Sequence, residues 1–206
     1  KMNESPEIIK EKALMEFDNM VNNLIEQNVN IDSIEDKTEI LPDSIFLNNW
    51  LSFFPDGKLI IYPVKNKIRR QERRTDVIDY LIEKYDVTEF IDLTEFEDDN
   101  EFLESTGSVV FDYKNKTAYC SASPRSSEKV FNELCNLIGY KGFYFNTENL
   151  DGSAIYHTNV MMNVFENLVV ICSDSISNNL DKAMILESIK LTGRQILDIS
   201  FLQLNQ

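Results

Sequence analysis

The sequence contains few of the residues from which disulfide frameworks, zinc sites and phosphate-binding loops are built. Among its 206 residues are three cysteines, one histidine and six glycines. Because the cysteines are odd in number and lie far apart, they fit neither a disulfide framework nor a zinc site. The glycines lack the spacing of a phosphate-binding loop. Together with the lack of a secretory signal, this composition predicts a reducing, cytoplasmic location.

Positive charge is also scarce. Lysine and arginine together number 20 against 35 aspartates and glutamates, which gives a formal net charge of −15. Such a chain is a poor ligand for a nucleic-acid backbone or an anionic membrane surface, so we expect neither partner. No apolar run approaches the ~18 residues that a membrane span needs. Since 43% of the residues are hydrophobic, the sequence predicts a folded core rather than disorder.

The two ends of the sequence differ from those of a finished domain. The chain begins at Lys1 rather than at methionine, and residues 199–203 form an apolar, strand-like end. We therefore expect a chain truncated at both ends. Its exposed sheet edges and apolar surface would favour self-association or a homo-oligomer.

One order of elements, hairpin, helix and strand, recurs three times along the chain. The expected hairpins turn at Asp56-Gly57, at Lys114-Asn115 and at Glu166-Asn167. Each is followed by a segment with apolar residues at helical spacing and then by a short strand. The units are roughly 50 residues long, which is within the range of propeller-like repeats. The alternative is an ordinary α+β domain whose elements merely alternate.

A half-unit precedes the first hairpin. Its helix is expected to begin at Ser5-Pro6 and to carry one apolar face, and a strand is expected at Val29 to Ile34. We thus predict a single α/β domain over residues 1–206, with about three and a half repeated units.

Two residues are candidates for acid/base chemistry. His157 is the only histidine, and it interrupts the apolar segment Ile155–Val164, which is expected to be a strand. Histidine exchanges protons near pH 7, although a core histidine satisfied by a backbone carbonyl fits the pattern equally well. Glu104 lies between a strand and the turn Thr106-Gly107, where a carboxylate faces either a pocket or solvent.

Other features have both a functional and a plain structural interpretation. The pair Asn48-Asn49 suits a neutral polar ligand, but it also fits a turn. The only basic cluster, Arg69 to Arg74, suits a carboxylate ligand or a solvated helix start. The acidic run Glu95 to Glu101 is expected to be a solvated loop. Of the cysteines, Cys120 is the least implausible nucleophile, although a structural role is favoured.

Four segments together resemble the guanidino-group-modifying superfamily, which contains arginine deiminases, dimethylarginine hydrolases and amidinotransferases. The closer likeness is to its bacterial arginine-deiminase-related branch, which includes citrulline hydrolases. The resemblance covers about residues 13–203, and the segments occur in the family's order. They are Pro42–Phe53, Tyr62–Val64 with Arg69–Arg74, Phe102–Ser108, and Ile155–Met162.

The resemblance implies a pentein-type fold, a five-bladed α/β propeller around a central active site, of which this chain would form an incomplete ring. It implies that Glu104 and His157 are the acid/base pair beside the planar head group of the substrate. Arg69, which begins an Arg-x-x-Glu element, would hold the substrate α-carboxylate. Asn49 and Asn159 fall where arginine-processing relatives have aspartates. Because an amide suits a neutral ureido group better than a cationic guanidinium, these two residues favour citrulline.

The implied function is hydrolysis of a ureido or guanidino amino acid, foremost of citrulline to ornithine, carbon dioxide and ammonia. The family nucleophile is a cysteine in a Gly-rich segment near the C-terminus, which these 206 residues do not include, so we expect this chain to be inactive by itself. No metal or organic cofactor is implied, because a thiolate, a histidine and a glutamate suffice.

Other functions remain compatible with the resemblance. They are arginine deiminase or amidinotransferase activity, and a non-catalytic relative that binds an amino acid. Ser105 replaces a usual glycine of the family in the Glu104 motif, where a glycine allows close backbone approach or a positive φ. This departure raises the prospect of altered specificity or lost activity.

Overall fold

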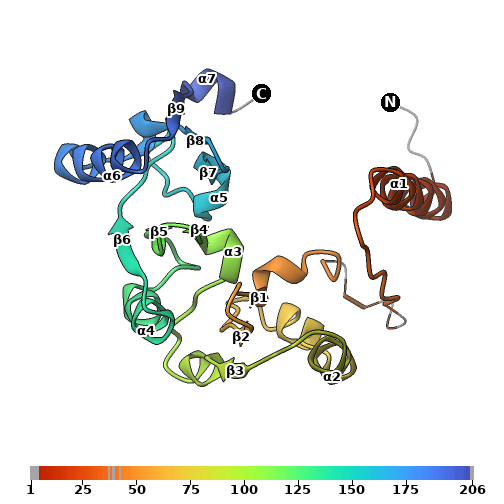
Figure 1. Ribbon diagram of the computed structural model, residues 1–206. Coiled ribbons are helices and arrows are strands. Elements are labelled where there is room, and N and C mark those ends of the chain that lie inside the picture. Colours follow the sequence, from red (N-terminus) through yellow and green to blue (C-terminus); the bar gives the residue numbers. More distant parts are fainter. Residues whose placement is uncertain (1–4, 37, 39, 42, 205–206) are drawn as a thin grey trace. The chain divides into compact units, whose positions relative to one another are not determined.

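The computed structural model describes residues 5–36, 38, 40–41 and 43–204 (Figure 1). The chain divides into two compact units, Lys1–Lys37 and Thr38–Gln206. The prediction of a single domain over residues 1–206 stays a prediction.

The first unit contains one long helix, α1 (Pro6–Glu26). Its start is as predicted: the Ser5 side chain accepts a hydrogen bond from the Ile8 N–H at 3.5 Å, and proline occupies the first turn. None of the residues of α1 is buried. The strand expected at Val29 to Ile34 is not formed, and the segment is irregular. A strand needs a neighbour for its backbone groups, and none of the described strands pairs with this segment.

Within residues 43–204, the second unit contains three sheets of three strands each. In each sheet the first two strands form an antiparallel hairpin, and the third lies parallel to the second. The strands are β1 (Leu51–Phe53), β2 (Lys58–Ile61), β3 (Glu89–Asp92), β4 (Val109–Asp112), β5 (Thr117–Ser121), β6 (Lys141–Phe145), β7 (Met162–Val164), β8 (Leu168–Ile171) and β9 (Gln195–Asp198).

One helix connects the second strand of each sheet to the third. These helices are α2 (Thr75–Lys84), α4 (Glu128–Ile138) and α6 (Asn179–Leu191). Figure 1 shows the three sheets of this unit in sequence, with the three helices on their outer side. The hairpin–helix–strand order predicted from the sequence is thereby confirmed in all three units.

Helix α4 shows why the sequence folds in this way. Five of its apolar residues recur at three- and four-residue spacing and are buried: Val130, Phe131, Leu134, Cys135 and Ile138. Each such side chain contributes roughly 1.5–3 kcal/mol when it is fully removed from water. The helix ends where predicted, at Gly139, whose φ of +68° is the left-handed conformation that glycine adopts at low cost.

Apolar side chains also join neighbouring sheets. Phe54, just after β1, packs edge-on against Phe111 of β4, with 5.1 Å between the ring centroids. Both belong to a buried cluster that continues under α4. A second cluster joins Val110 and Tyr119 of the middle sheet to the side chains of β7, β8 and α6. The three sheets therefore share their cores with their neighbours.

Two segments that were expected to be strands contain short helical turns instead. The first half of the predicted strand Ile155–Val164 is wrong, because α5 (Thr158–Met161) precedes β7. The apolar segment at residues 199–203 is not a strand either, because α7 (Phe201–Leu204) follows β9 and the Gln203 amide oxygen accepts from the Ser200 backbone N–H at 3.0 Å. Similar turns are η1 (Leu47–Asn49), η2 (Arg69–Glu72), η3 (Thr94–Glu97), α3 (Ser105–Ser108) and η4 (Ser173–Ser175).

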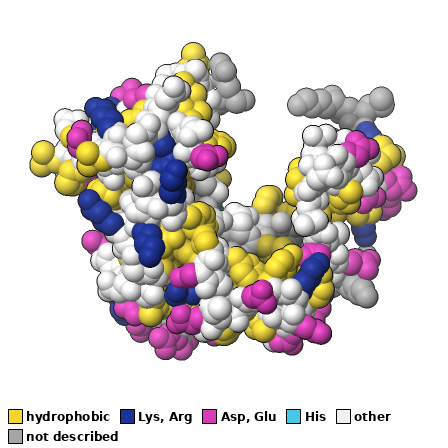
Figure 2. Space-filling view, in the orientation of Figure 1, with side chains coloured by type: hydrophobic (Ala, Val, Ile, Leu, Met, Phe, Trp, Pro, Cys, Tyr) yellow, Lys and Arg dark blue, Asp and Glu magenta, His cyan; other side chains and the backbone are white. Residues whose placement is uncertain are grey.

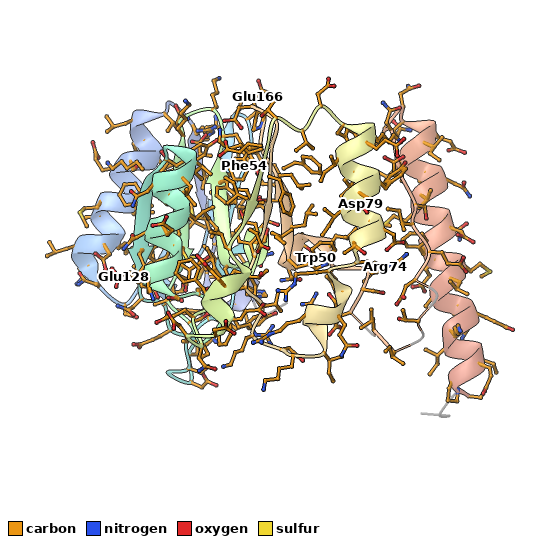
Figure 3. All side chains as sticks on the ribbon, turned by 90° about the horizontal axis from the view of Figure 1, so that it is seen from below. Trp50, Phe54, Arg74, Asp79, Glu128 and Glu166 are labelled. Carbon is orange, nitrogen blue, oxygen red and sulfur yellow. The ribbon has the colours of Figure 1, made fainter. Side chains whose placement is uncertain are left out.

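The hairpin turns and the candidate residues lie at opposite ends of the sheets. In Figure 3, Phe54 and Glu166 mark the end with the hairpin turns, and Trp50, Arg74 and Glu128 lie toward the other. Because Leu51 pairs with Ile61, the segment before β1 and the segment after β2 meet at that second end.

Candidate active site

Two of the predicted site residues occupy equivalent positions in successive units. Glu104 is the N-cap of α3, and His157 is the N-cap of α5. Each lies twelve residues after the end of a closing strand, at Asp92 and Phe145, and five residues before the next hairpin begins, at Val109 and Met162. The repeat therefore brings both side chains to the same end of adjoining sheets.

Glu104 and His157 form a buried pair. His157 Nε2 lies 2.8 Å from Glu104 Oε2, and the two residues are 6% and 0% exposed. In the view of Figure 2 no histidine surface is visible, which agrees with this burial. Two further groups hold the carboxylate: Arg125 Nη1 donates to Oε2 at 3.3 Å, and the Lys65 backbone N–H donates to Oε1 at 3.3 Å.

These contacts keep Glu104 ionised. Burial alone would raise the pKa of its carboxyl group, but the His157 hydrogen bond and the positive charge of Arg125 outweigh burial, so the pKa lies below its usual value. A carboxylate only accepts hydrogen bonds, so His157 Nε2 carries a hydrogen. In a neutral ring Nδ1 is then the nitrogen with a free lone pair for proton exchange.

Gly107 allows Asn49 to approach this pair. A Cβ atom at Gly107 would lie 2.7 Å from Asn49 Nδ2 and 3.0 Å from both Cε1 and Nδ1 of His157. Any larger residue at position 107 would therefore collide with both side chains. Asn49 itself is buried at the end of η1. The structure thus brings together three of the predicted site residues: Asn49, Glu104 and His157.

Arg69 is buried against its own helical turn. Its Nε and Nη2 atoms donate to the two carboxylate oxygens of Glu72 at 3.0 and 2.9 Å, and Nη2 also donates to the Phe46 carbonyl oxygen at 3.3 Å. Burial opposes the charge, but the Glu72 contact and the nearby carboxylates of Glu104 and Asp43 raise the pKa of Arg69. Arg69 is therefore a fixed cation near Glu104, and its hydrogen bonds to described residues all come from Nε and Nη2.

Asn159 makes none of these contacts. It lies in α5, two residues after His157, and its side chain is exposed.

Two contacts of the site were missed by the sequence analysis. Arg125 contacts Glu104 from the segment after β5, and its guanidinium lies 5.4 Å from the ring of Tyr156. The Tyr156 ring in turn lies 4.8 Å from the imidazole ring of His157. Arg125 is a single arginine between a proline and a serine, so no local pattern indicates its role. Its proximity to Glu104 depends on the pairing of the sheets.

None of the three cysteines is placed as a nucleophile beside this pair. Cys120 and Cys135 are buried in the core under α4, and Cys172 is buried in the next core. Burial raises the pKa of all three thiols, that of Cys135 to about 12. At neutral pH they are protonated and unreactive. The structural role expected for Cys120 fits this placement.

Among the residues that the structure describes, no three or more His, Cys, Asp or Glu side chains form a group that could hold a metal ion. In the same part of the chain, no helix combines the length and the apolar character of a membrane-crossing segment.

Three solved structures show the same fold at low identity. Apo ArgZ, an arginine dihydrolase from the ornithine-ammonia cycle in cyanobacteria, matches with a TM-score of 0.68 and 14% identity over 92% of this chain and 28% of its own. A cysteine-to-alanine variant of AgrE in complex with L-arginine gives 0.72 and 12% over 94% of this chain and 27% of its own. A cysteine-to-serine variant of the DDAH from Pseudomonas aeruginosa, complexed with citrulline, gives 0.52 and 13% over 79% and 71%.

The family comparison covers the whole sequence. No curated protein matches the chain. This chain spans less than a third of ArgZ and AgrE. The superfamily inferred from the four sequence segments is confirmed, and no comparison tests the citrulline-hydrolase branch. Residues 1–206 match the family described as N,N dimethylarginine dimethylhydrolase, eukaryotic, so the chain belongs to that family of the guanidino-group-modifying superfamily.

Proposed function

We propose that this chain carries the acid/base and substrate-binding part of a hydrolase for a ureido or guanidino amino acid, with citrulline as the preferred substrate. The overall reaction consumes citrulline and water and yields ornithine, carbon dioxide and ammonia. The observation that carries this proposal is the buried Glu104–His157 pair with an asparagine, Asn49, beside it.

The pair supplies the proton transfers. A thiolate that attacks the central carbon of the ureido group needs a proton donor for the leaving amine and a base for the water that releases the product. His157 fills both roles, because it is held by an ionised carboxylate through Nε2 and exchanges its proton at the other nitrogen. Glu104 fixes the orientation of the ring and stabilises its protonated form.

The charges around the pair support a neutral head group. The carboxylate of Glu104 is already balanced by Arg125 and by His157 when the ring is protonated. A cationic guanidinium would need a further carboxylate, whereas Asn49 offers an amide oxygen and an amide N–H for a ureido group. Leaving a buried guanidinium unpaired would be costly. Asn159, two residues after His157, is the second amide that we assign to the head group.

Arg69 binds the substrate α-carboxylate in this proposal. Glu72 and the Phe46 carbonyl hold its Nε and Nη2 atoms, which fixes the guanidinium and directs the remaining Nη1 donor to a ligand.

The nucleophile of the proposed reaction is a cysteine other than Cys120, Cys135 and Cys172, since all three are buried with raised pKa values. The hairpin–helix–strand units are, in the same proposal, three of the five that form a closed propeller around the site. A cysteine from the remaining part of that ring would complete the catalytic group.

The position of the three cysteines also favours a second function, binding of the amino acid without turnover. The two functions share the binding residues and differ in the thiol. Analysis of products from citrulline, arginine and dimethylarginine separates them, and it also detects arginine deiminase or amidinotransferase activity.

Calorimetric titration with citrulline and arginine tests the substrate preference. The protein is expected to bind citrulline more tightly than arginine, and Asn49→Asp is expected to reverse this order by about 10- to 100-fold, since a charged hydrogen bond contributes about 1.5–3 kcal/mol. Arg69→Ala is expected to weaken the binding of both amino acids.

Asn48→Asp is the matched control. Asn48 is the exposed neighbour of Asn49, so its substitution adds the same charge one position earlier in the chain, on an exposed side chain. The preference for citrulline is expected to survive in this variant. Tighter binding of arginine than of citrulline by the unmodified protein would contradict the proposed substrate.

A further inference from the structure

The residue that directly follows His157 ties the short helices of the site to each other. Thr158 is fully buried. Its Oγ1 donates a hydrogen bond to the Ser108 carbonyl oxygen and accepts one from the Ser121 backbone N–H at 2.7 Å. Ser108 is the last residue of α3, and Ser121 is the last residue of β5. One hydroxyl group therefore connects α5 to α3 and to the middle sheet.

This contact joins the two short helices whose N-cap residues form the acid/base pair. Ser108 belongs to the same helical turn as Glu104: its N–H donates to the Glu104 carbonyl oxygen at 3.1 Å, and its Oγ accepts from the Glu104 N–H at 3.0 Å. Thr158 is covalently joined to His157. The Thr158–Ser108 bond thus fixes the distance between the two backbones that carry the 2.8 Å contact.

The same kind of hydrogen bond occurs in the preceding hairpin–helix–strand repeat. Ser105 directly follows Glu104, and its Oγ donates to the Leu51 carbonyl oxygen at 3.0 Å. In both units, therefore, a hydroxyl group that follows the site residue bonds to a backbone carbonyl of the unit before it. Two occurrences at equivalent positions indicate a function of the hydroxyl rather than a chance contact.

The two backbone groups that bond to the Thr158 hydroxyl have no water to replace it. Ser121, whose backbone N–H donates to Thr158, is held in place by a hydrogen bond of its side chain, because its Oγ lies 2.5 Å from Thr147 Oγ1. Ser108, Ser121 and Thr158 are all fully buried, so water does not reach the carbonyl and N–H groups that Thr158 satisfies.

We propose that Thr158 is a positioning residue, whose hydroxyl group holds the imidazole of His157 in register with the carboxylate of Glu104. This inference rests on the proposed acid/base role of the pair. The hydroxyl acts by fixing α5 against α3, and the methyl group of Thr158 only fills space. Thr158 itself touches no substrate in this proposal.

The ring signal of the single histidine provides the test. A two-dimensional ¹H–¹³C spectrum of the histidine ring reports His157 alone, because the sequence has no other histidine. Glu104→Gln supplies the reference position for a disrupted pair. Two matched pairs of chains then isolate the hydroxyl: wild type against Thr158→Val, and Thr158→Ser against Thr158→Ala.

The chains that lack the hydroxyl, Thr158→Val and Thr158→Ala, are expected to move the ring signal toward its position in Glu104→Gln. Thr158→Ser is expected to keep the wild-type position. Coincident ring signals in all folded variants would overturn the proposal. Loss of folding in Thr158→Val and Thr158→Ala, seen by circular dichroism while Thr158→Ser folds, would also overturn it, because the hydroxyl would then act on stability alone.

This readout is independent of the proposed function. The ring signal reports the contact between two side chains in the protein without ligand. A protein that binds no citrulline would contradict the proposed substrate and leave the result for Thr158 unchanged.

Discussion

Glu104 is a fully buried carboxylate that remains charged because three donors surround it. His157, Arg125 and the Lys65 N–H all point at its two oxygens. Since the pKa of Glu104 in the folded protein is lowered, its ionisation stabilises the fold above its usual pKa, and this contribution is lost as the pH falls through the lower folded value. The charge needed for orienting His157 is thus present at neutral pH.

Ser105 combines backbone strain with a buried hydrogen bond. Its φ is +39°, in the left-handed region that favours glycine, and its hydroxyl donates to the Leu51 carbonyl oxygen. Of the two reasons considered for a glycine at this position, close backbone approach or a positive φ, the backbone of Ser105 shows the second. The hydrogen bond provides a reason for serine to occupy it despite a backbone cost of about 1–3 kcal/mol.

Two substitutions of Ser105 separate these effects. Ser105→Ala keeps the strain and loses the hydrogen bond, so it is expected to lower the free energy of unfolding by about 1–3 kcal/mol. Ser105→Gly loses the same bond but relieves the strain, and it is expected to be more stable than Ser105→Ala by about 1 kcal/mol. Urea denaturation at pH 7 measures both. Equal stability of the two variants would contradict the assignment of strain to Ser105.

At the scale of single residues, type and local pattern were sufficient for some of the site. His157 could be singled out because it is the only histidine and interrupts an apolar segment, and Glu104 because it lies between an expected strand and the turn Thr106-Gly107. Arg125 could not, because its contact with Glu104 spans 21 residues of chain and depends on where β5 ends. The difference lies in whether the signal is local in the sequence.

At the scale of elements, a side-chain carboxylate that was expected to be solvated holds the segment after β2 in place. The side chain of Glu97, in η3, is only 10% exposed. It accepts hydrogen bonds from the Val64 N–H at 2.8 Å and from Arg73, and it pairs with Arg70 at 3.2 Å. The prediction is therefore wrong for Glu97. Its partners Arg70 and Arg73 belong to the basic cluster found in the sequence, but Arg73 lies 24 residues before Glu97 and only the fold brings them together.

Glu97→Gln is expected to destabilise the fold by about 1–3 kcal/mol, because it removes a charged partner from two arginines and retains an acceptor for the Val64 N–H. Glu95→Gln is the matched control, since Glu95 lies in the same helical turn with an exposed side chain. Its effect is expected to stay within about 0.5 kcal/mol. Urea denaturation measures the free energy of unfolding of both variants. Equal decreases in the two would show that Glu97 does not hold the segment after β2.

A buried ion pair joins the middle sheet to the third sheet at the opposite end. Arg194 contacts both carboxylate oxygens of Asp112, at 2.6 and 3.0 Å, and its Nε donates to the Phe165 carbonyl oxygen at 2.8 Å. Burial opposes the charge of Asp112, but the hydrogen bonds from Arg194 and Asn115 lower its pKa below 3.8. The pair therefore stabilises the fold above this pH and loses its effect as the pH falls through the lowered pKa.

Asp112→Asn is expected to cost about 3–5 kcal/mol at pH 7, because it leaves a buried arginine without its partner. The difference from wild type is expected to shrink as the pH falls below 3.8. Urea denaturation over a pH series measures this trend. Asp174→Asn removes the exposed partner of Lys182 and is expected to cost no more than about 1 kcal/mol at pH 7. A constant deficit of Asp112→Asn at all pH values would contradict the role of its charge.

Element types followed from the sequence wherever periodicity and turn residues agreed. Helix α4 and the hairpin at Asp56-Gly57 are examples. The segment before β7 was misread, because its apolar residues suit a strand and the turn of α5 is set by tertiary bonds of Thr158. The strand expected at Val29 to Ile34 failed for a different reason: hydrogen-bond partners for a strand are supplied by the fold and not by the segment.

At the scale of the whole molecule, the repeat explains why residues distant in sequence share a site. Each hairpin–helix–strand repeat has a short helical turn at the same end of its sheet. Figure 1 shows α3 and α5 on the inner side of the compact unit Thr38–Gln206, away from α4 and α6. Contacts such as Thr158 with Ser108 then set neighbouring units against each other. Function in this account belongs to the junctions between units rather than to any one of them.

The central claim is that the Glu104–His157 pair and Asn49 bind the ureido group of an amino acid. The ring signal of His157, followed by NMR during addition of citrulline, tests this claim most directly, because the sequence has only one histidine. We expect a saturable shift with citrulline and none with ornithine, which has the same backbone and lacks the ureido group. A ring signal that stays in place at millimolar citrulline, or that moves equally with ornithine, would contradict it.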